Sequence, residues 1–150
     1  MMNANILEPA PQPVDEDVQP CTILVVDDDE AMCQVLAERL TRQGYELLVA
    51  HNGAQGLAKA RTERPNLILL DLRLPDMDGL AVCEELADGP ETCDVPVIIL
   101  SGMERPDIIR RSRAAGCQYY LRKPYDPNAL LILIQHAMGE SRQWSAAFED

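Results

Sequence analysis

The stretch LILLDLRLPDMDG, residues 67–79, decides the fold class of this chain. It opens with an uninterrupted apolar run, reaches Asp71, and ends in a loop that contains Pro, Asp and Gly. A short continuous apolar run is typical of a parallel strand that is covered on both faces. Open α/β sheets bind their ligands beyond the carboxyl ends of such strands. The stretch therefore predicts a buried strand with a functional carboxylate at its end.

Similar apolar runs lie on both sides of this strand in the sequence. The five predicted strands are TILVV (22–26), YELLVA (45–50), NLILL (66–70), VPVIIL (95–100) and CQYYL (117–121). The segments between them carry apolar residues at helical spacing. The predicted helices cover residues 30–43, 53–63, 79–88, 106–116 and 127–138. Alternating strands and helices indicate a parallel sheet with helices on both faces.

The length of 150 residues and the hydrophobic content of 47% suit one compact domain. We expect a flexible leader over residues 1–20, which holds four prolines and the acidic run Asp15-Glu16-Asp17. The folded domain is expected over residues 21–138, and residues 139–150 form a C-terminal tail. The tail carries Trp144 and Phe148 four residues apart, either as a docking element or as a cap on the domain surface that extends the last helix.

The net charge of −12 opposes general affinity for the phosphate backbone of nucleic acids. The chain has five cysteines without a CxxC motif, which argues against a disulfide framework and against a zinc site. No apolar run approaches the length of a membrane span, and the N-terminus lacks the pattern of a signal peptide. We expect a cytoplasmic protein that binds neither nucleic acid directly nor membranes.

Four of the predicted strands are followed by residues that carry chemistry. Asp27, Asp28 and Asp29 follow the first strand, and Asp71 follows the third. Ser101 follows the fourth strand and Lys123 follows the fifth. Each acidic residue alone is more often a helix cap or a solvated turn residue. Carboxylates that converge on one edge repel each other unless a cation neutralises them, and an all-oxygen site suits Mg²⁺.

Four motifs give the chain a clear resemblance to the receiver domains of two-component response regulators. They are ILVVDDD (23–29), LILLDLRLPDMDG (67–79), VIILSG (97–102) and YLRKPY (120–125). Together these motifs cover the chain from about residue 21 to residue 138 and are highly specific. The resemblance implies a flavodoxin-like, doubly wound (βα)5 fold with the parallel strand order 2-1-3-4-5, which receiver proteins share with flavodoxin.

The resemblance also implies roles for individual residues. Asp71 would accept the phosphoryl group, while Asp27, Asp28, Asp71 and the backbone carbonyl of Arg73 would hold Mg²⁺. Ser101 and Lys123 would bind phosphoryl oxygens. Tyr120 would be the switch aromatic, although a tyrosine at the end of a buried strand is also a plain core residue. The Lys123-Pro124 peptide bond would be cis, and Asp29 is interpreted as a charge that favours the start of the next helix.

The implied function is that of a phosphorelay response regulator without enzymatic activity beyond its own phosphorylation and dephosphorylation. The expected partners are a histidine kinase or a histidine phosphotransfer protein, and an unidentified target that binds the face of residues 104–125. Six basic residues lie in that stretch, namely Arg105, Arg110, Arg111, Arg113, Arg122 and Lys123. A solvated helix face is the simpler interpretation of this basic stretch.

Other classes of protein fit the sequence less well. A phosphatase of the haloacid dehalogenase type needs a second Asp two residues after the nucleophile, where this chain has Arg73. A dinucleotide-binding enzyme needs a glycine-rich turn after the first strand, where this chain has Asp27-Asp28-Asp29. The alternative that remains open is a receiver fragment of a larger regulator with a DNA-binding or enzymatic output.

Overall fold

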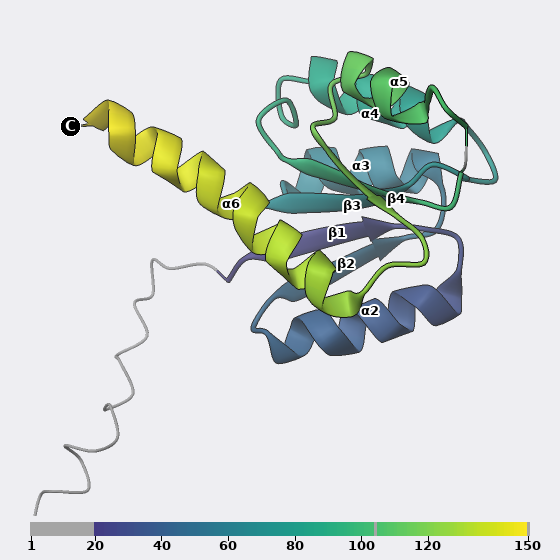
Figure 1. Ribbon diagram of the computed structural model, residues 1–150, viewed down its shortest axis with the longest axis horizontal. Coiled ribbons are helices and arrows are strands. Elements are labelled where there is room, and N and C mark those ends of the chain that lie inside the picture. The colour runs from purple at the N-terminus through teal and green to yellow at the C-terminus, as the bar shows by residue number, and fades with distance from the viewer. Residues whose placement is uncertain (1–19, 104, 150) are drawn as a thin grey trace, which may run out of the picture.

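The computed structural model describes residues 20–103 and 105–149, and in this part of the chain strands and helices alternate (Figure 1). The strands are β1 (Thr22–Val26), β2 (Glu46–Ala50), β3 (Leu67–Asp71), β4 (Val97–Ser101) and β5 (Tyr119–Arg122). The helices are α2 (Glu30–Arg42), α3 (Gly53–Glu63), α4 (Gly79–Asp88), α5 (Ile108–Ala114) and α6 (Pro127–Glu149). All strands pair in parallel in the order β2-β1-β3-β4-β5, which confirms the predicted fold class.

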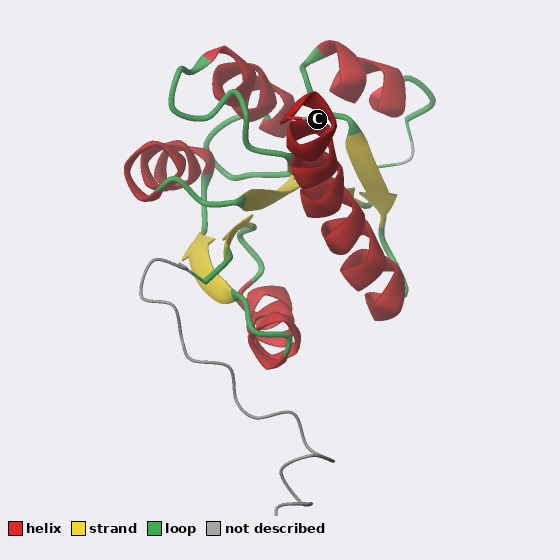
Figure 2. Ribbon diagram, turned by 90° about the vertical axis from the view of Figure 1, so that its left-hand side faces the viewer, coloured by secondary structure: helices red, strands yellow, loops and turns green. Residues whose placement is uncertain are grey.

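The helices cover both faces of the sheet, with α2 and α6 on one face and α3, α4 and α5 on the other (Figures 1 and 2). Successive side chains of a strand point to opposite faces, so the central strand β3 contributes to two separate cores. Ile68 and Leu70 pack beneath α3 and α4, whereas Leu67 and Leu69 pack beneath α2 and α6. Burial on both faces is the physical reason for the continuous apolar run that the sequence shows there.

Polar side chains cap the starts of α2, α3 and α4 next to the carboxyl edge of the sheet. Asp29 accepts a hydrogen bond from the Met32 amide, which confirms its predicted role at the start of α2. Asn52 caps α3 and Asp78 caps α4 in the same way. These caps satisfy amide groups that have no partner inside the helix. They also fix the points at which the chain leaves the strand ends.

Several element boundaries differ from the prediction. Strands β3 and β4 include Asp71 and Ser101 as their last residues, because both residues still pair with the neighbouring strand. Helix α5 begins at Ile108 and not at Pro106. The Asp107 side chain lies near two arginines, at 3.6 and 3.9 Å, and caps no helix amide. Strand β5 begins at Tyr119, two residues later than predicted.

Helix α6 continues to Glu149, well past the predicted end near residue 138, and extends beyond the sheet (Figure 1). This length corresponds to the predicted extension of the last helix into the tail. The side chains of Trp144 and Phe148 lie outside the described part, so their role as a docking element or as a surface cap stays a prediction. Residues 1–19 of the predicted leader also lie outside the described residues. The Lys123-Pro124 bond is cis, as predicted. None of the described helices is long and apolar enough to cross a membrane.

Candidate functional site

Three acidic side chains meet at the carboxyl edge because β1 and β3 are neighbours in the sheet. Asp27 and Asp28 follow β1, and Asp71 ends β3. Each offers a carboxylate oxygen, and these oxygens lie within 4.8 Å of one another. Asp27 is buried, Asp71 is half-buried, and Asp28 is exposed. The predicted cluster is therefore assembled, with one side open to solvent.

Asp27 is fixed by its own backbone and by two neighbouring side chains. Its carboxylate accepts a hydrogen bond from the Asp29 amide at 3.0 Å. Its carbonyl oxygen accepts the Cys33 thiol at 3.6 Å and lies 3.2 Å from Nδ1 of His51. Burial raises the pKa of the Asp27 carboxyl above its ordinary value of 3.8, and the negative charge of Asp71 adds to this effect. A cation beside Asp27 would oppose both effects.

Lys123 reaches the cluster from the end of β5 and joins its two inner carboxylates. Its ammonium nitrogen lies 3.2 Å from Asp27 and 3.2 Å from Asp71. Burial alone would lower the pKa of Lys123, but the charges of Asp71 and Asp27 outweigh it and raise the pKa above 10.5. Lys123 therefore places a positive charge beside Asp71, and its role toward a phosphoryl group stays a prediction.

Asp71 and Arg73 are connected through the backbone of the loop that follows β3. One carboxylate oxygen of Asp71 accepts the Arg73 amide at 2.9 Å, and the other faces Lys123. Arg73 also forms an antiparallel bridge with Asp78, while its side chain is exposed. The Asp71 contact and the bridge hold the Arg73 amide beside the carboxylate cluster, and the role of the Arg73 carbonyl stays a prediction.

The fourth and fifth strands supply Ser101 and Tyr120. Ser101 is fully buried, and its hydroxyl oxygen accepts the Met103 amide at 3.1 Å. Tyr120 packs against the core under α3, α4 and α5, together with Met103. Its hydroxyl is buried without a hydrogen-bond partner among the described residues. A buried hydroxyl without a partner is unfavourable, so this side of the site holds a polar group that another conformation could satisfy.

The donor set of the cluster fits a hard divalent cation. Asp27, Asp28 and Asp71 offer only oxygen atoms, and the exposed side leaves room for water and for an anionic ligand. Mg²⁺ prefers oxygen ligands and keeps several water molecules in its shell. Burial and the negative charge of Asp71 both disfavour the charged form of Asp27, and a cation would offset both. The side chains therefore fit Mg²⁺ better than zinc, which favours nitrogen and sulfur ligands.

Two features near the cluster were not found from the sequence. The carboxylate of Asp76 accepts the amides of Gly53 and Ala54 at 2.7 and 2.9 Å. His51 lies against the Asp27 carbonyl, as described above. Asp76 belongs to an acidic and glycine-containing loop whose composition predicts a turn and nothing more specific. These contacts join segments that are distant in the sequence, and no local pattern reports them.

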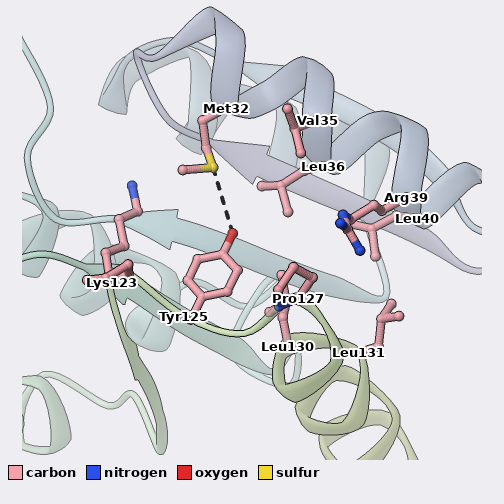
Figure 3. A pocket seen from close by; sticks show the side chains of 11 residues that line it. Met32, Val35, Leu36, Arg39, Leu40, Lys123, Tyr125, Pro127, Leu130 and Leu131 are labelled. Atoms are coloured by element: carbon pink, nitrogen blue, oxygen red, sulfur yellow. Dashed lines mark hydrogen bonds between the residues drawn. The ribbon is translucent and has the colours of Figure 1, made fainter.

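An apolar groove between α2 and α6 adjoins the cluster (Figure 3). Its volume is about 380 Å³. Tyr125 donates to the Met32 sulfur at 3.8 Å within it, and Lys123 lies at one end. Val35 on its rim is 51% exposed. The groove is lined by Met32, Val35, Leu36, Arg39, Leu40, Lys123, Pro124, Tyr125, Pro127, Leu130 and Leu131.

The five-stranded parallel sheet is that of a doubly wound α/β domain, and three carboxylates and a lysine lie together at its carboxyl edge. The sequence matches the response regulator receiver domain over residues 23–135. The chain belongs to this family.

Relatives and solved structures agree with this assignment. The response regulator PleD of Caulobacter vibrioides is 41% identical over 114 residues, which cover 75% of this chain and 25% of PleD. The polar-differentiation response regulator DivK of Brucella anthropi is 31% identical, with 81% of this chain and 99% of DivK covered. A CheY-like receiver domain protein from Methanospirillum hungatei superposes with a TM-score of 0.79 at 32% identity, covering 83% of this chain and 98% of that structure. The chain thus spans about a quarter of the length of PleD.

Proposed function

We propose that this receiver domain accepts a phosphoryl group on the carboxylate of Asp71, with Mg²⁺ held by Asp27, Asp28, Asp71 and the carbonyl of Arg73. The single observation that carries the proposal is the gathering of three carboxylates within 4.8 Å, with the Lys123 ammonium 3.2 Å from Asp71. Two nonacceptor carboxylates and one ammonium around a half-buried acceptor form a site for a metal and a phosphoryl group together.

The chemistry is a transfer of one phosphoryl group between two nucleophiles. An Asp71 oxygen forms a bond to phosphorus while the bond from phosphorus to the imidazole nitrogen of the donor breaks, and the product is an aspartyl phosphate. Bound Mg²⁺ would supply charge neutralisation for the incoming phosphoryl oxygens. Lys123 supplies a further positive charge, and the Ser101 hydroxyl supplies a hydrogen-bond donor once it turns to the phosphoryl group. No enzymatic activity beyond self-phosphorylation and self-dephosphorylation is proposed.

The phosphoryl group would shift the balance between two conformations on the β4 and β5 side of the site. Ser101 would exchange its contact with the Met103 amide for a phosphoryl oxygen, and the loop that follows would move with it. Tyr120, whose buried hydroxyl has no partner among the described residues, is the side chain that would respond. Phosphorylation changes this balance only through its different contacts in the two states.

We propose the face of residues 104–125 as the surface that a downstream partner reads. Ile109 on α5 is 50% exposed, and Arg110 and Arg113 are exposed beside it in the sequence. An exposed apolar side chain among basic residues suits an amphipathic helix with an acidic face. The supporting observation is that this stretch includes Lys123, whose ammonium lies 3.2 Å from Asp71, and Tyr120, which packs against the same core as α5.

The phosphodonor would be a histidine kinase or a histidine phosphotransfer protein. The apolar groove between α2 and α6 supports docking of such a protein, because Lys123 lies both in the groove and against Asp71. A cytoplasmic location is part of the proposal, and the five free cysteines support a reducing compartment. The alternative, a receiver that belongs to a larger regulator, stays open, because the chain matches 25% of PleD and 99% of DivK.

The central test uses a small phosphodonor and intact-protein mass spectrometry. Incubation with Mg²⁺ and acetyl phosphate is expected to add one phosphoryl group to the protein, and EDTA is expected to prevent the addition. Asp71→Asn is expected to abolish the adduct, whereas Asp88→Asn, an exposed carboxylate at the end of α4, serves as the matched control. An adduct that persists in Asp71→Asn, or a wild-type protein that gains none, contradicts the proposed function.

A further inference from the structure

The loop that carries Arg73 is closed at its base. The Gly79 amide donates to the Leu72 carbonyl at 3.1 Å, and Arg73 and Asp78 form an antiparallel bridge. A Cβ atom on Gly79 would lie 2.5 Å from the Leu72 Cα, so the two ends of the loop touch without room for a side chain. Residues 72–79 therefore form a small hairpin-like loop, and its orientation depends on the contacts of its tip.

The tip of this loop is bound to the start of α3. Both carboxylate oxygens of Asp76 accept backbone amides there, from Gly53 at 2.7 Å and from Ala54 at 2.9 Å. The first amides of a helix have no partner inside the helix, so they are free to bind a carboxylate. These two hydrogen bonds hold the pKa of Asp76 below its ordinary value of 3.8. Asp76 thus joins the loop to a helix 23 residues earlier in the chain.

Steric packing supports the same attachment. Met77 lies directly on Gly53, and a Cβ atom at Gly53 would come 2.3 Å from the Met77 Cγ. Only glycine leaves space for the loop at this distance. Hydrogen bonding by Asp76 and packing by Met77 therefore position the loop tip through independent contacts.

The same part of α3 also holds the end of β1. A Cβ atom on Gly56 would lie 2.9 Å from both γ carbons of Val26, the residue directly before Asp27. Nδ1 of His51 lies 3.2 Å from the Asp27 carbonyl oxygen. Residues 51–56, which we call the α3 entry segment, therefore contact both the backbone of Asp27 and the loop that follows Asp71.

We propose that the α3 entry segment sets the spacing between Asp27 and the Asp71–Arg73 backbone, and that Asp76 is the positioning residue through which it does so. This inference rests on the proposed magnesium site. Mg²⁺ requires near-octahedral geometry with short bonds to oxygen, so its affinity is sensitive to ligand placement. Releasing the loop tip is expected to weaken Mg²⁺ binding while the ligands themselves stay in the chain.

The first test measures the Kd for Mg²⁺ of the unphosphorylated protein by isothermal titration calorimetry. Asp76→Ala is expected to raise the Kd about 3- to 10-fold, less than the 10- to 100-fold common for partners that bond a ligand directly, because Asp76 acts through the loop. Asp94→Ala removes the same charge at the opposite edge of the sheet, next to Cys21, and is expected to leave the Kd within about twofold, because an exposed charge at that distance is screened.

Salt separates positioning from simple charge attraction. A Coulomb effect of Asp76 on Mg²⁺ fades between about 0.1 M and about 1 M salt, whereas a change in ligand placement persists. The ratio of the two Kd values, Asp76→Ala over wild type, is therefore expected to stay about the same at both salt concentrations. A ratio that falls to one at high salt would overturn the positioning role.

The second test breaks the attachment without changing any charge. Gly53→Ala places a methyl group against Met77 and is expected to weaken Mg²⁺ binding about 3-fold, although alanine favours the helix that begins there. The double variant Gly53→Ala, Met77→Ala removes the clash and is expected to bind Mg²⁺ as Met77→Ala does. Thermal unfolding of each variant reports whether the fold is retained.

The outcomes distinguish this inference from the proposed function. A wild-type protein that does not bind Mg²⁺ contradicts the proposed function itself. A wild-type protein that binds Mg²⁺, with Asp76→Ala and Gly53→Ala both within twofold of it, overturns this inference and leaves the proposed function standing. Loss of affinity in Gly53→Ala that disappears when the double variant is compared with Met77→Ala supports it, because the effect of Gly53→Ala then depends on its clash with the half-buried Met77 side chain.

Discussion

On the β1 and β3 side of the site the loops are tied to helix α3, whereas on the β4 side the loop after Ser101 has few attachments among the described residues. Asp76 binds two α3 amides, and the Asp27 carbonyl contacts two side chains. After β4, Ser101 contacts the Met103 amide, and α5 begins without a side-chain cap. Helices α2, α3 and α4, in contrast, each begin with a side-chain cap.

This difference separates two tasks that a phosphorylated switch must perform. A metal site needs ligands that keep their positions, and the α3 side is built in that way. A change of conformation needs a segment whose alternative arrangement costs little, and a short, uncapped helix with a loop before it provides one. Under the proposed function, metal binding and the conformational response would therefore lie on opposite sides of Asp71.

The largest expected change in stability comes from replacing one glycine on each side of Asp71. Gly79→Ala would push a Cβ atom against the Leu72 backbone at 2.5 Å and is expected to lower the free energy of unfolding by about 2 to 3 kcal/mol. The added Cβ atom of Gly102→Ala would lie 3.9 Å from the Lys123 Cβ, so this variant is expected to change the free energy of unfolding by less than about 0.5 kcal/mol. Urea unfolding measures both. Equal losses would contradict the difference between the two sides.

A slightly smaller effect is expected when the Lys123 charge, which contacts both Asp27 and Asp71, is removed. Lys123→Met leaves the buried Asp27 carboxylate without its ammonium partner and is expected to lower the free energy of unfolding by about 2 kcal/mol in EDTA. Excess Mg²⁺ is expected to restore part of this loss, because a bound cation replaces the missing charge. Arg110→Met, on an exposed position of α5, is the control. A loss that Mg²⁺ leaves unchanged would argue against a cation beside Asp27.

A smaller effect is expected from the hydroxyl of Tyr120. Because this hydroxyl is buried without a partner among the described residues, Tyr120→Phe is expected to raise the free energy of unfolding of the unphosphorylated protein by about 0.5 to 1 kcal/mol. Tyr119→Phe, one residue earlier and half-buried, is the comparison. A clear loss of stability in Tyr120→Phe would mean that the hydroxyl has a partner.

The smallest expected effect is the response of Asp76 to acid. Its carboxyl has a lower pKa in the folded protein than in the unfolded chain, so its attachment to α3 contributes at neutral pH and is lost as the pH falls through the folded pKa, below 3.8. NMR spectra recorded during an acid titration are expected to show the Gly53 and Ala54 amide signals shifting together with this midpoint. A midpoint above 3.8 would show that the carboxylate does not bind these amides in solution.

Much of the site could be predicted because short sequence patterns place its residues at strand ends and helix starts. The apolar runs indicated each strand, and Asp71 and Ser101 were found at strand ends because parallel strands point to one functional edge. Asp29 was recognised as favouring a helix start for the same local reason. The resemblance to receiver domains then suggested roles for Arg73 and Tyr120 that no periodicity could supply, and these roles stay predictions.

Two element starts were predicted too early. Pro106 resembles the first residue of a helix, but α5 begins at Ile108, and the Asp107 side chain lies near Arg105 and Arg111 and caps no helix amide. Strand β5 begins at Tyr119 because that residue is the first to pair with β4, at Ile98. The start of β5 was therefore set by pairing with another strand, which residue propensity alone does not report.

The alternation of strands and helices, the burial of β3 on both faces, and the edge at which the acidic residues lie all follow from the sequence, because they depend on local apolar periodicity and on the geometry of parallel strands. The contacts of Lys123 with Asp27 and Asp71, and of Asp76 with the start of α3, are known only from the folded structure. Such contacts depend on where the crossovers bring distant backbone groups together, to within about the length of a hydrogen bond, and no short stretch of sequence contains that information.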